Sequence, residues 1–305
     1  MAIQNVKVAI NGQTYDLLYN EETKKWENTL NAPGKSSYNE DGHYFNVEIT
    51  AQDDAGNKAV VNAQTEGSIG ESLRLVVKEK VKPIITILSP GADAFLANSQ
   101  PEISISLKDD DSGIDINSFS LSIDSQSALN SSSPGMVVSP VEGGYDITYT
   151  PVLALEDGVH SLVVNVRDHD GNTGEEKSRS FTIDTVPPVL NVTNPTDNYV
   201  TNKTELIISG NTNDVTSGSV VVAILLNEID QGEVIVEESG IFSKSVTLVE
   251  GSNIVKITAT DRAGKSTTIT RNVTLNTVAP KITSVELIPN PVDAGQTFII
   301  KVQVS

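Results

Sequence analysis

One turn occurs three times in the chain, as Asp53-Asp54-Ala55-Gly56, Asp168-His169-Asp170-Gly171 and Asp261-Arg262-Ala263-Gly264. A second landmark keeps the same spacing, because Gly42, Gly158 and Gly251 lie 14, 13 and 13 residues before the turn glycines. Apolar and polar side chains alternate between the two landmarks, as they do in half-buried strands. The repeat therefore predicts tandem β-modules built around a hairpin rather than around helices.

Composition limits the kinds of partner that suit the chain. It has 305 residues, enough for three modules of about 90 to 105 residues, each with its own core. Its 40 Asp and Glu against 21 Lys and Arg give a net charge of −19, which repels nucleic acid and anionic lipid. Without cysteine, it can form neither disulfides nor a thiolate site. We therefore expect no nucleic-acid partner, no membrane partner and no redox chemistry.

The N-terminal segment 1–7 has no basic stretch followed by an apolar one, and no small-residue cleavage site. The sequence also contains no run of about 18 apolar residues that could span a bilayer. Signal-dependent export is thus not supported by these residues. A fragment of a longer exported protein would show the same features, so this alternative stays open.

Proline-containing junctions mark the expected module boundaries, at Val81-Lys82-Pro83, Val186-Pro187-Pro188 and Val278-Ala279-Pro280. Proline fixes its own φ and favours an extended residue before it, so these junctions are expected to be stiff. The predicted domains are residues 1–82, 83–186 and 187–279, followed by a two-strand tail at 280–305. End to end, such modules would form an elongated rod on the order of 100 Å long.

Modules 2 and 3 share their first strands as well as their turns. An extended run between two prolines opens each, at 83–90 and 188–195, and two further short apolar strands follow, at 102–107 and 119–123 and at 205–209 and 220–224. About seven short strands per module predict an all-β immunoglobulin-like sandwich. On these motifs, the chain resembles bacterial immunoglobulin-like domains of surface adhesins and of tail-associated proteins in phages and prophages of Gram-positive bacteria. The resemblance covers nearly the whole chain and implies a fold more than a function.

Module 1 and the tail depart from this pattern in complementary ways. Val6-Lys7-Val8-Ala9-Ile10-Asn11 matches the third strand of module 3, so module 1 lacks the first two strands. Segments 280–289 and 296–304 match those two strands, with nothing after them. We expect an open edge at Val6, Val8 and Ile10. The candidate donor strands carry five apolar residues: Ile282, Val285, Phe298, Ile300 and Val302.

Two interpretations follow from this complementarity. In the first, the tail of one molecule, or a partner, completes module 1 of another by strand addition, and a head-to-tail contact of this kind builds rings or filaments. In the second, module 1 is a shorter variant and the tail is the beginning of a further module. The mass of the protein in solution distinguishes them.

Histidines are the first candidates for catalysis, and all three fall in repeated turns. His43 and His160 lie near the lead-in glycines and His169 lies in the Asp-x-x-Gly turn. None is accompanied by a nucleophile motif or by metal-ligand spacing. Acidic residues in repeated turns are likewise explained as turn formers and solubilising charge, although their number alone does not rule out a carboxylate-pair glycosidase. We therefore expect no catalytic residues and no enzymatic activity.

Trp26 is the only tryptophan and the natural candidate for sugar stacking. It stands where the repeat has Tyr145 and Phe242, which favours a position in the sandwich interior. Module 1 nevertheless holds six of the chain's aromatic residues within 82 positions. If a glycan, host surface or other partner is bound, module 1 is the expected place.

Calcium is the one cofactor that the acidic loops suggest. Asp109, Asp110, Asp111, Asp168 and Asp170 could supply the oxygen ligands that this ion prefers. No EF-hand spacing accompanies them, and the default interpretation is a solvated turn with no cofactor.

The sequence thus predicts a non-enzymatic structural or adhesive array. A phage or prophage virion component, associating with itself or with other virion proteins, is the first hypothesis. A fragment of a bacterial cell-surface adhesin, located outside the cell, is the alternative.

Overall fold

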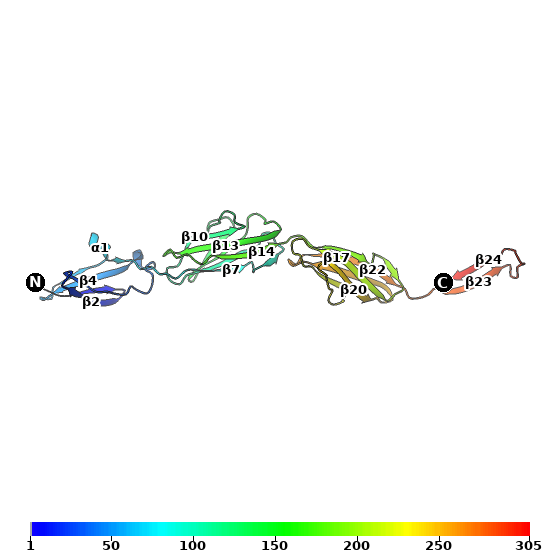
Figure 1. Cartoon of the computed structure of the whole chain (residues 1–305), viewed down its shortest axis with the longest axis horizontal. Coiled ribbons are helices and arrows are strands. Elements are labelled where there is room, and N and C mark those ends of the chain that lie inside the picture. The colour runs from blue at the N-terminus through cyan, green and yellow to red at the C-terminus, as the bar shows by residue number, and fades with distance from the viewer. Residues whose placement is uncertain (1) are drawn as a thin grey trace. The chain divides into compact units, whose positions relative to one another are not determined.

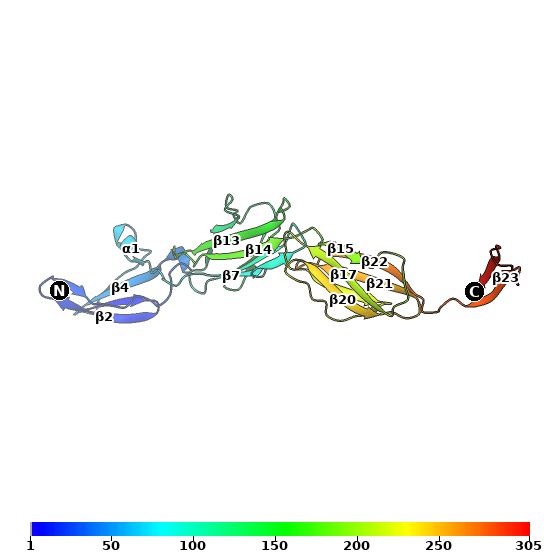
Figure 2. The same ribbon diagram turned by 45° about the vertical axis from the view of Figure 1, so that its right-hand side comes forward.

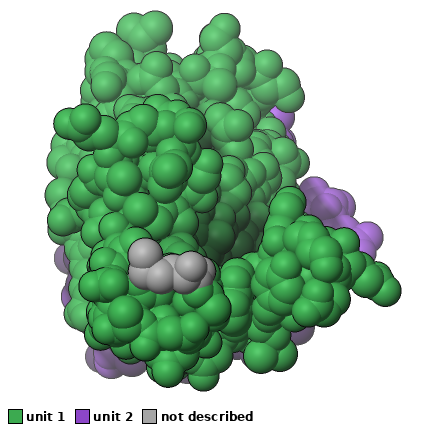
Figure 3. All heavy atoms as spheres, turned by 90° about the vertical axis from the view of Figure 1, so that its left-hand side faces the viewer, with its two compact units in different colours: residues 1–94, 98–183 green, residues 95–97, 184–305 purple. Residues whose placement is uncertain are grey.

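The structure is a computed structural model and describes residues 2–305. Contacts divide the chain into two units, which Figure 3 colours separately. Unit 1 holds residues 1–94 and 98–183, and unit 2 holds residues 95–97 and 184–305. Module 1, module 2, module 3 and tail denote the predicted ranges 1–82, 83–186, 187–279 and 280–305.

Module 1, in unit 1, is a single sheet in the order β3-β2-β1-β4-β5, with β6 paired to the start of β4. Its strands are β1 (Ile3–Ile10), β2 (Gln13–Asn20), β3 (Lys25–Glu27), β4 (Phe45–Asp53), β5 (Lys58–Val61) and β6 (Arg74–Leu75). The first hairpin turns at Asn11 and Gly12, whose φ values of 46° and 74° suit a two-residue hairpin loop. No second sheet faces this one within residues 2–82.

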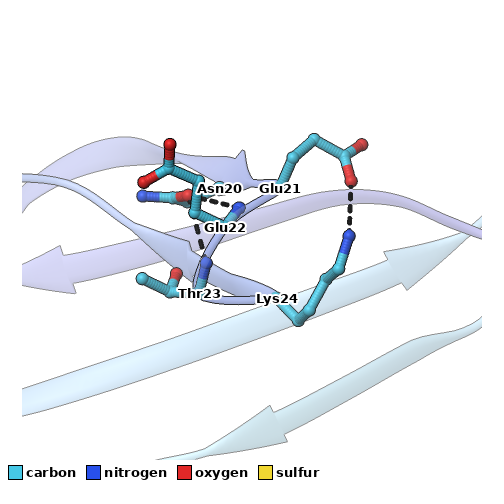
Figure 4. A network of polar contacts seen from close by, with 5 residues as sticks. All are labelled: Asn20, Glu21, Glu22, Thr23 and Lys24. Carbon is cyan, nitrogen blue, oxygen red and sulfur yellow. Dashed lines mark hydrogen bonds and ion pairs between the residues drawn. The ribbon is translucent and has the colours of Figure 1, made fainter.

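The turn between β2 and β3 is held by local polar contacts (Figure 4). Asn20 Oδ1 accepts hydrogen bonds from the backbone N–H groups of Glu22 and Thr23, at 2.9 and 3.3 Å. Lys24 forms an ion pair with Glu21 at 2.9 Å. These contacts let the chain reverse between the two strands without support from another element.

Module 2, in unit 1 except for residues 95–97 and 184–186, consists of two sheets. One has the order β10-β13-β14-β8 and the other β11-β12-β9-β7. The strands are β7 (Ile84–Ser89), β8 (Ala94–Leu96), β9 (Ile103–Lys108), β10 (Ile114–Ile123), β11 (Met136–Val141), β12 (Gly144–Tyr149), β13 (Gly158–Asp168) and β14 (Lys177–Ile183). The pairs β10–β13, β13–β14, β11–β12, β12–β9 and β7–β9 are antiparallel. Alternate residues of β9 and β13 are buried, which is the period of a strand with one face in a core.

Module 3, in unit 2, repeats the two-sheet arrangement (Figures 1 and 2). One sheet has the order β15-β17-β20 and the other β16-β22-β21-β18-β19. The strands are β15 (Val189–Asn194), β16 (Tyr199–Thr201), β17 (Glu205–Asn213), β18 (Val221–Leu226), β19 (Ile229–Asp230), β20 (Ile241–Thr247), β21 (Gly251–Thr260) and β22 (Ser266–Leu275). β16 and β22 pair in parallel, through Tyr199 with Val273, Val200 with Thr274 and Thr201 with Leu275.

The core of module 3 lies between its two sheets. Phe242 from one sheet and Ile224 and Ile257 from the other are almost fully buried. Burial of such side chains stabilises a fold by about 1.5 to 3 kcal/mol each. The core therefore depends on both sheets being present.

The tail forms a hairpin of its own in unit 2, made of β23 (Ile282–Ile288) and β24 (Ile299–Val304). Every residue of both strands is exposed. A two-stranded hairpin is at best marginally stable alone in water, so its apolar side chains need a partner surface.

The fold class is confirmed: the chain is almost entirely β, with tandem β-sandwich modules. The one α-helix of residues 2–305 is α1 (Ser68–Ser72), which follows β5. None of the helices in this part of the chain has the length and apolar character needed to cross a membrane.

Candidate functional site

The sequence-based prediction of an open edge at Val6, Val8 and Ile10 is wrong. These residues lie on β1, which pairs with β2 on one side and with β4 on the other. Val6 and Val8 are buried and Ile10 is half-buried. The outermost strands of the sheet are β3 and β5, because a long second strand and a short third strand extend it beyond β1.

What module 1 does offer is an apolar sheet face. Residues that pair directly across antiparallel strands point to the same side, and so do residues two apart along a strand. The pairs Val8 with Tyr15, Val8 with Ile49 and Tyr19 with Trp26 therefore define one face. Its apolar members are Val6, Val8, Ile10, Tyr15, Leu17, Tyr19, Trp26, Phe45, Val47, Ile49, Ala51, Ala59 and Val61. All but Val6, Val8 and Phe45 are half-buried or exposed.

Trp26 belongs to this face rather than to a sandwich interior. It lies on β3, is half-buried, and contacts Tyr19 with a ring-centroid distance of 5.6 Å. Phe242, which occupies the matching place in the repeat, lies on β20 in the opposing sheet of module 3 and is 1% exposed. The repeat register thus located the aromatic correctly along the sequence, but β3 pairs with β2 instead of joining a second sheet.

The tail hairpin has an apolar face of similar character. Val285 pairs with Val302 and Leu287 pairs with Ile300, so these four side chains point the same way. Ile282, paired with Val304, extends the same face, and Phe298 precedes β24. Among these residues, exposure ranges from 42% for Leu287 to 63% for Ile282. All five predicted donor residues are therefore solvent-accessible.

The three Asp-x-x-Gly turns share a hydrogen-bonded carboxylate at their first position. Asp53 Oδ1 accepts the backbone N–H of Asn57 at 2.9 Å, Asp168 Oδ1 that of Asn172 at 2.8 Å and Asp261 Oδ1 that of Lys265 at 2.8 Å. The turn glycines have φ between 85° and 94°, which explains their recurrence.

The second carboxylate oxygen, Oδ2, has a hydrogen-bond partner in two of these turns but not in the third. The Asn57 and Asn172 side chains donate to Asp53 Oδ2 and Asp168 Oδ2, at 2.9 and 2.7 Å. The asparagine side chain is the main reason why the pKa of Asp53 lies below its ordinary value. Lysine replaces this asparagine at position 265, and Asp261 Oδ2 is buried without a hydrogen-bond partner.

Two groups of three carboxylates come together at matching places. Glu79, Asp109 and Asp168 form the unit 1 carboxylate group, and Asp184, Asp214 and Asp261 form the unit 2 carboxylate group. Within each group, one oxygen from every residue lies within 4.8 Å of the others. Glu79 and Asp184 both stand four residues before a junction proline, a repeated position that the sequence-based search missed.

Of the five predicted calcium ligands, the structure thus brings together Asp109 and Asp168. Asp170 and Asp111 accept backbone hydrogen bonds instead, from Glu79 at 2.9 Å and from Ser36 at 3.0 Å. Asp110 is exposed. Burial raises the pKa of Glu79, and the neighbouring Asp109 and Asp111 charges add to the rise. The backbone N–H of Ser112, which donates to Glu79 Oε1 at 2.8 Å, opposes it.

His160 has a structural environment. Its Nδ1 lies 2.6 Å from Asp124 Oδ2 and its Nε2 lies 2.7 Å from the Glu156 carbonyl oxygen. Both partners are acceptors, so only the imidazolium form satisfies both contacts. Burial opposes the charge, but these hydrogen bonds outweigh it and raise the pKa of His160 above its ordinary value. His43 and His169 both stack on Tyr38, with ring-centroid distances of 4.4 and 4.0 Å.

Comparisons with protein families assign the two complete modules separately. Residues 90–185 match a bacterial Ig-like domain, and residues 188–277 match domain B of glucodextranase, a non-catalytic domain. Bacillopeptidase F of Bacillus subtilis (strain 168) is 28% identical over 175 residues. This alignment covers 54% of the present chain and 12% of that protein, so the chain spans a small part of it.

Two solved structures are among those with similarity to the chain. The fibronectin(III)-like modules of Clostridium thermocellum CbhA share 17% identity with a TM-score of 0.39, covering 63% of this chain and 94% of that chain. Sidekick-1 immunoglobulin domains 1–5 share 14% identity with a TM-score of 0.38, covering 100% and 60%. The strand topology and the family match of residues 90–185 together support an array of bacterial Ig-like domains.

Proposed function

We propose that this array is a non-catalytic structural or adhesive protein whose copies associate head to tail. The tail hairpin of one copy docks on the apolar sheet face of module 1 in another. The observation that carries the proposal is a pair of apolar surfaces. The module 1 sheet has no facing sheet within residues 2–82 and most of its apolar face stays partly exposed, and every residue of the two tail strands is exposed.

The complete modules support this pairing of surfaces. In module 3, β15 and β17 form an antiparallel pair that, together with β20, covers the sheet containing β18 and β21. β23 and β24 pair in the same antiparallel sense, as do β7 and β9. The hairpin therefore has the form of the two opening strands of modules 2 and 3.

Docking here is face to face rather than through the backbone edge of β1, which is already paired on both sides. Apolar area removed from water contributes about 25 cal/mol per Å², so the contact is driven mainly by the two apolar faces. The surfaces differ on the two molecules, and repetition of such a contact gives a ring or an open filament.

Light scattering on the full chain and on a chain ending at Thr277 tests the proposal. We expect the mass of the full chain to rise with protein concentration and the shortened chain to stay monomeric. Trp26 lies on the acceptor face, so its fluorescence should shift as the full chain associates and stay constant without the tail. A monomeric full chain over a wide concentration range would refute head-to-tail docking.

A matched pair of tail variants distinguishes docking through one face from non-specific hydrophobic association. Leu287 and Ile288 are each 42% exposed but point to opposite faces of β23. Leu287→Asp should abolish association, because it places a charge in the apolar contact, whereas Ile288→Asp should retain it. Equal effects of the two variants would argue against the assigned face.

The place of this assembly is also a proposal. A phage or prophage virion component suits a structural array whose sequence resembles tail-associated proteins. Mass spectrometry of purified particles tests this, and the chain should copurify with tail or capsid proteins at a fixed ratio.

The second candidate is a spacer or adhesin on the bacterial cell surface. The bacterial Ig-like match of module 2 and the similarity to Bacillopeptidase F favour it. Here the chain should be found in the cell-wall fraction, and surface-exposed protein should be removed by protease treatment of intact cells.

A further inference from the structure

We propose that the unit 2 carboxylate group, Asp184, Asp214 and Asp261, is a calcium-binding site. One oxygen from each residue lies within 4.8 Å of the others, close enough for all three to contact one ion. The three residues are separated in sequence, and the fold brings them together: Asp184 precedes β15, Asp214 follows β17 and Asp261 follows β21.

An unpartnered oxygen is the observation that distinguishes this group from an ordinary acidic cluster. Asp261 is 7% exposed, and its Oδ2 is buried without a hydrogen-bond partner. The equivalent oxygens of Asp53 and Asp168 each accept a hydrogen bond from an asparagine side chain. A buried carboxylate oxygen without any partner is costly, and a bound cation would remove that cost.

The charge of the site leads to the same conclusion. Asp184 is 0% exposed and Asp214 is 8% exposed, so three negative groups share a nearly water-free place. Local donors satisfy two of the carboxylate oxygens. The backbone N–H of Ser217 donates to Asp214 Oδ1 at 2.6 Å, and Ser217 Oγ donates to Asp184 Oδ2. Among residues 2–305, the ion pairs include neither Asp214 nor Asp261. A divalent cation would balance most of this charge.

The ligand atoms that the three side chains offer indicate which kind of ion would bind. All three side chains offer carboxylate oxygens, with no nitrogen or sulfur ligand, which suits a hard cation. Calcium accepts six to eight oxygen ligands in irregular arrangements, so backbone oxygens and water can complete the shell. Magnesium demands near-ideal octahedral geometry, which a set of three residues from three separate loops meets less easily.

The unit 1 carboxylate group provides an internal comparison. There the Asn172 side chain donates to Asp168 Oδ2 at 2.7 Å, and the longer Glu79 stands where unit 2 has Asp184. Asp168 Oδ2, which corresponds to the unpartnered Oδ2 of Asp261, therefore already has a hydrogen-bond partner. The proposal is limited to the unit 2 group.

The test is a calcium titration of the full chain after removal of metal with a chelator. Isothermal calorimetry with calcium chloride should show saturable binding at this site with a Kd of about 10⁻³ M or tighter, as in extracellular calcium modules. Hydrogen exchange should show slower exchange in β17 and β21 with calcium than with chelator, and magnesium at the same concentration should have a smaller effect. No heat and no change in exchange at millimolar calcium would overturn the proposal.

Variants then assign the binding to the site. Asp261→Asn keeps the size of the side chain but removes the charged ligand, and we expect at least a tenfold loss of affinity at this site. Asp53→Asn changes the same turn position in module 1, where the aspartate belongs to neither carboxylate group, and should leave calcium affinity unchanged. Binding unaltered by Asp261→Asn, or weakened equally by both variants, would overturn the assignment. Because wild-type protein is titrated first, the result does not depend on how well a variant folds.

Discussion

Strands β4 of module 1 and β21 of module 3 share a sequence pattern but differ in burial. Residues 47–51 and 255–259 both follow Val-x-Ile-Thr-Ala, and both lead into an Asp-x-Ala-Gly turn. Val255, Ile257 and Ala259 are 0% exposed, whereas all three apolar residues of 47–51 are only half-buried. Local sequence therefore determines the strand and its turn, and the facing sheet determines whether the strand becomes core.

The difference has an energetic meaning. A face that keeps part of its exposure gains less from folding, because hydrophobic stabilisation scales with the area removed from water. Module 1 thus keeps apolar surface that a partner could bury, whereas the corresponding surface of module 3 is already buried in its core. This is the physical basis for expecting a partner at module 1 and not at the sheets of module 3.

The largest expected effect on stability comes from truncating the equivalent isoleucines of modules 1 and 3. Ile257→Ala should destabilise module 3 by about 3 to 4 kcal/mol, since it leaves a cavity in a closed core, and Ile49→Ala should cost module 1 about 1 kcal/mol. Trp26 fluorescence in urea follows module 1, and hydrogen exchange of β21 follows module 3. Equal losses would mean that both faces are equally covered.

A smaller and equal effect is expected from the turns. Gly56→Ala and Gly264→Ala each place a Cβ at a φ of 85°, where nothing lies closer than 3.9 Å to the added atom. Only backbone strain remains, at about 1 to 2 kcal/mol in either module. Unfolding of the two variants, measured with the same two probes, should show matching losses. A loss confined to one module would show that the turns are not equivalent.

Module 2 should differ from module 3 in its response to pH. His160 lies where module 3 has Asn253, a neutral residue that is fully buried and bonded to Val249 and Gly251. Because the pKa of His160 is raised in the folded state, its contribution is complete below about pH 6.5 and is lost as pH rises through the folded value.

Hydrogen exchange of β13 and β21 at a series of pH values, corrected for intrinsic exchange rates, tests this prediction. Stability of module 2 should fall between neutral and mildly alkaline pH while that of module 3 changes less. His160→Asn should remove the difference. A wild-type module 2 without this pH dependence would contradict the assigned imidazolium.

The smallest effect is expected at the turn between β2 and β3. The Glu21 to Lys24 ion pair is solvent-exposed on both sides, and such pairs contribute less than about 1 kcal/mol. Lys24→Ala should leave the Trp26 unfolding midpoint almost unchanged, and added salt should not alter the comparison. A large shift would mean that this turn, rather than the sheet face, limits the stability of module 1.

Much of this fold follows from short-range patterns. Alternation in residues 254–259 and the Asp-x-x-Gly turns predict hairpins because strand period and turn chemistry are local properties. What local pattern does not determine is pairing: β1 was expected at an edge, yet β2 and β3 extend the sheet beyond it.

The candidate calcium site likewise depends on long-range contacts that local sequence patterns do not reveal. Acidic density in the sequence pointed to residues 109–111, but only Asp109 of these joins a carboxylate group. Asp184 and Asp261 stand alone in their local segments, and long-range folding brings them together. Comparing the residues four positions before each junction proline would have pointed to Glu79 and Asp184, since this position repeats with the modules.

The parallel pairing of β16 with β22 has a mechanical consequence. β16 lies near the beginning of module 3 and β22 at its end, so tension applied through the chain pulls the two strands in opposite directions along their length. Their backbone hydrogen bonds then bear the load together, in shear, instead of opening one after another. We expect module 3 to withstand stretching by atomic-force spectroscopy better than module 1, where residues 2–82 form only antiparallel pairs.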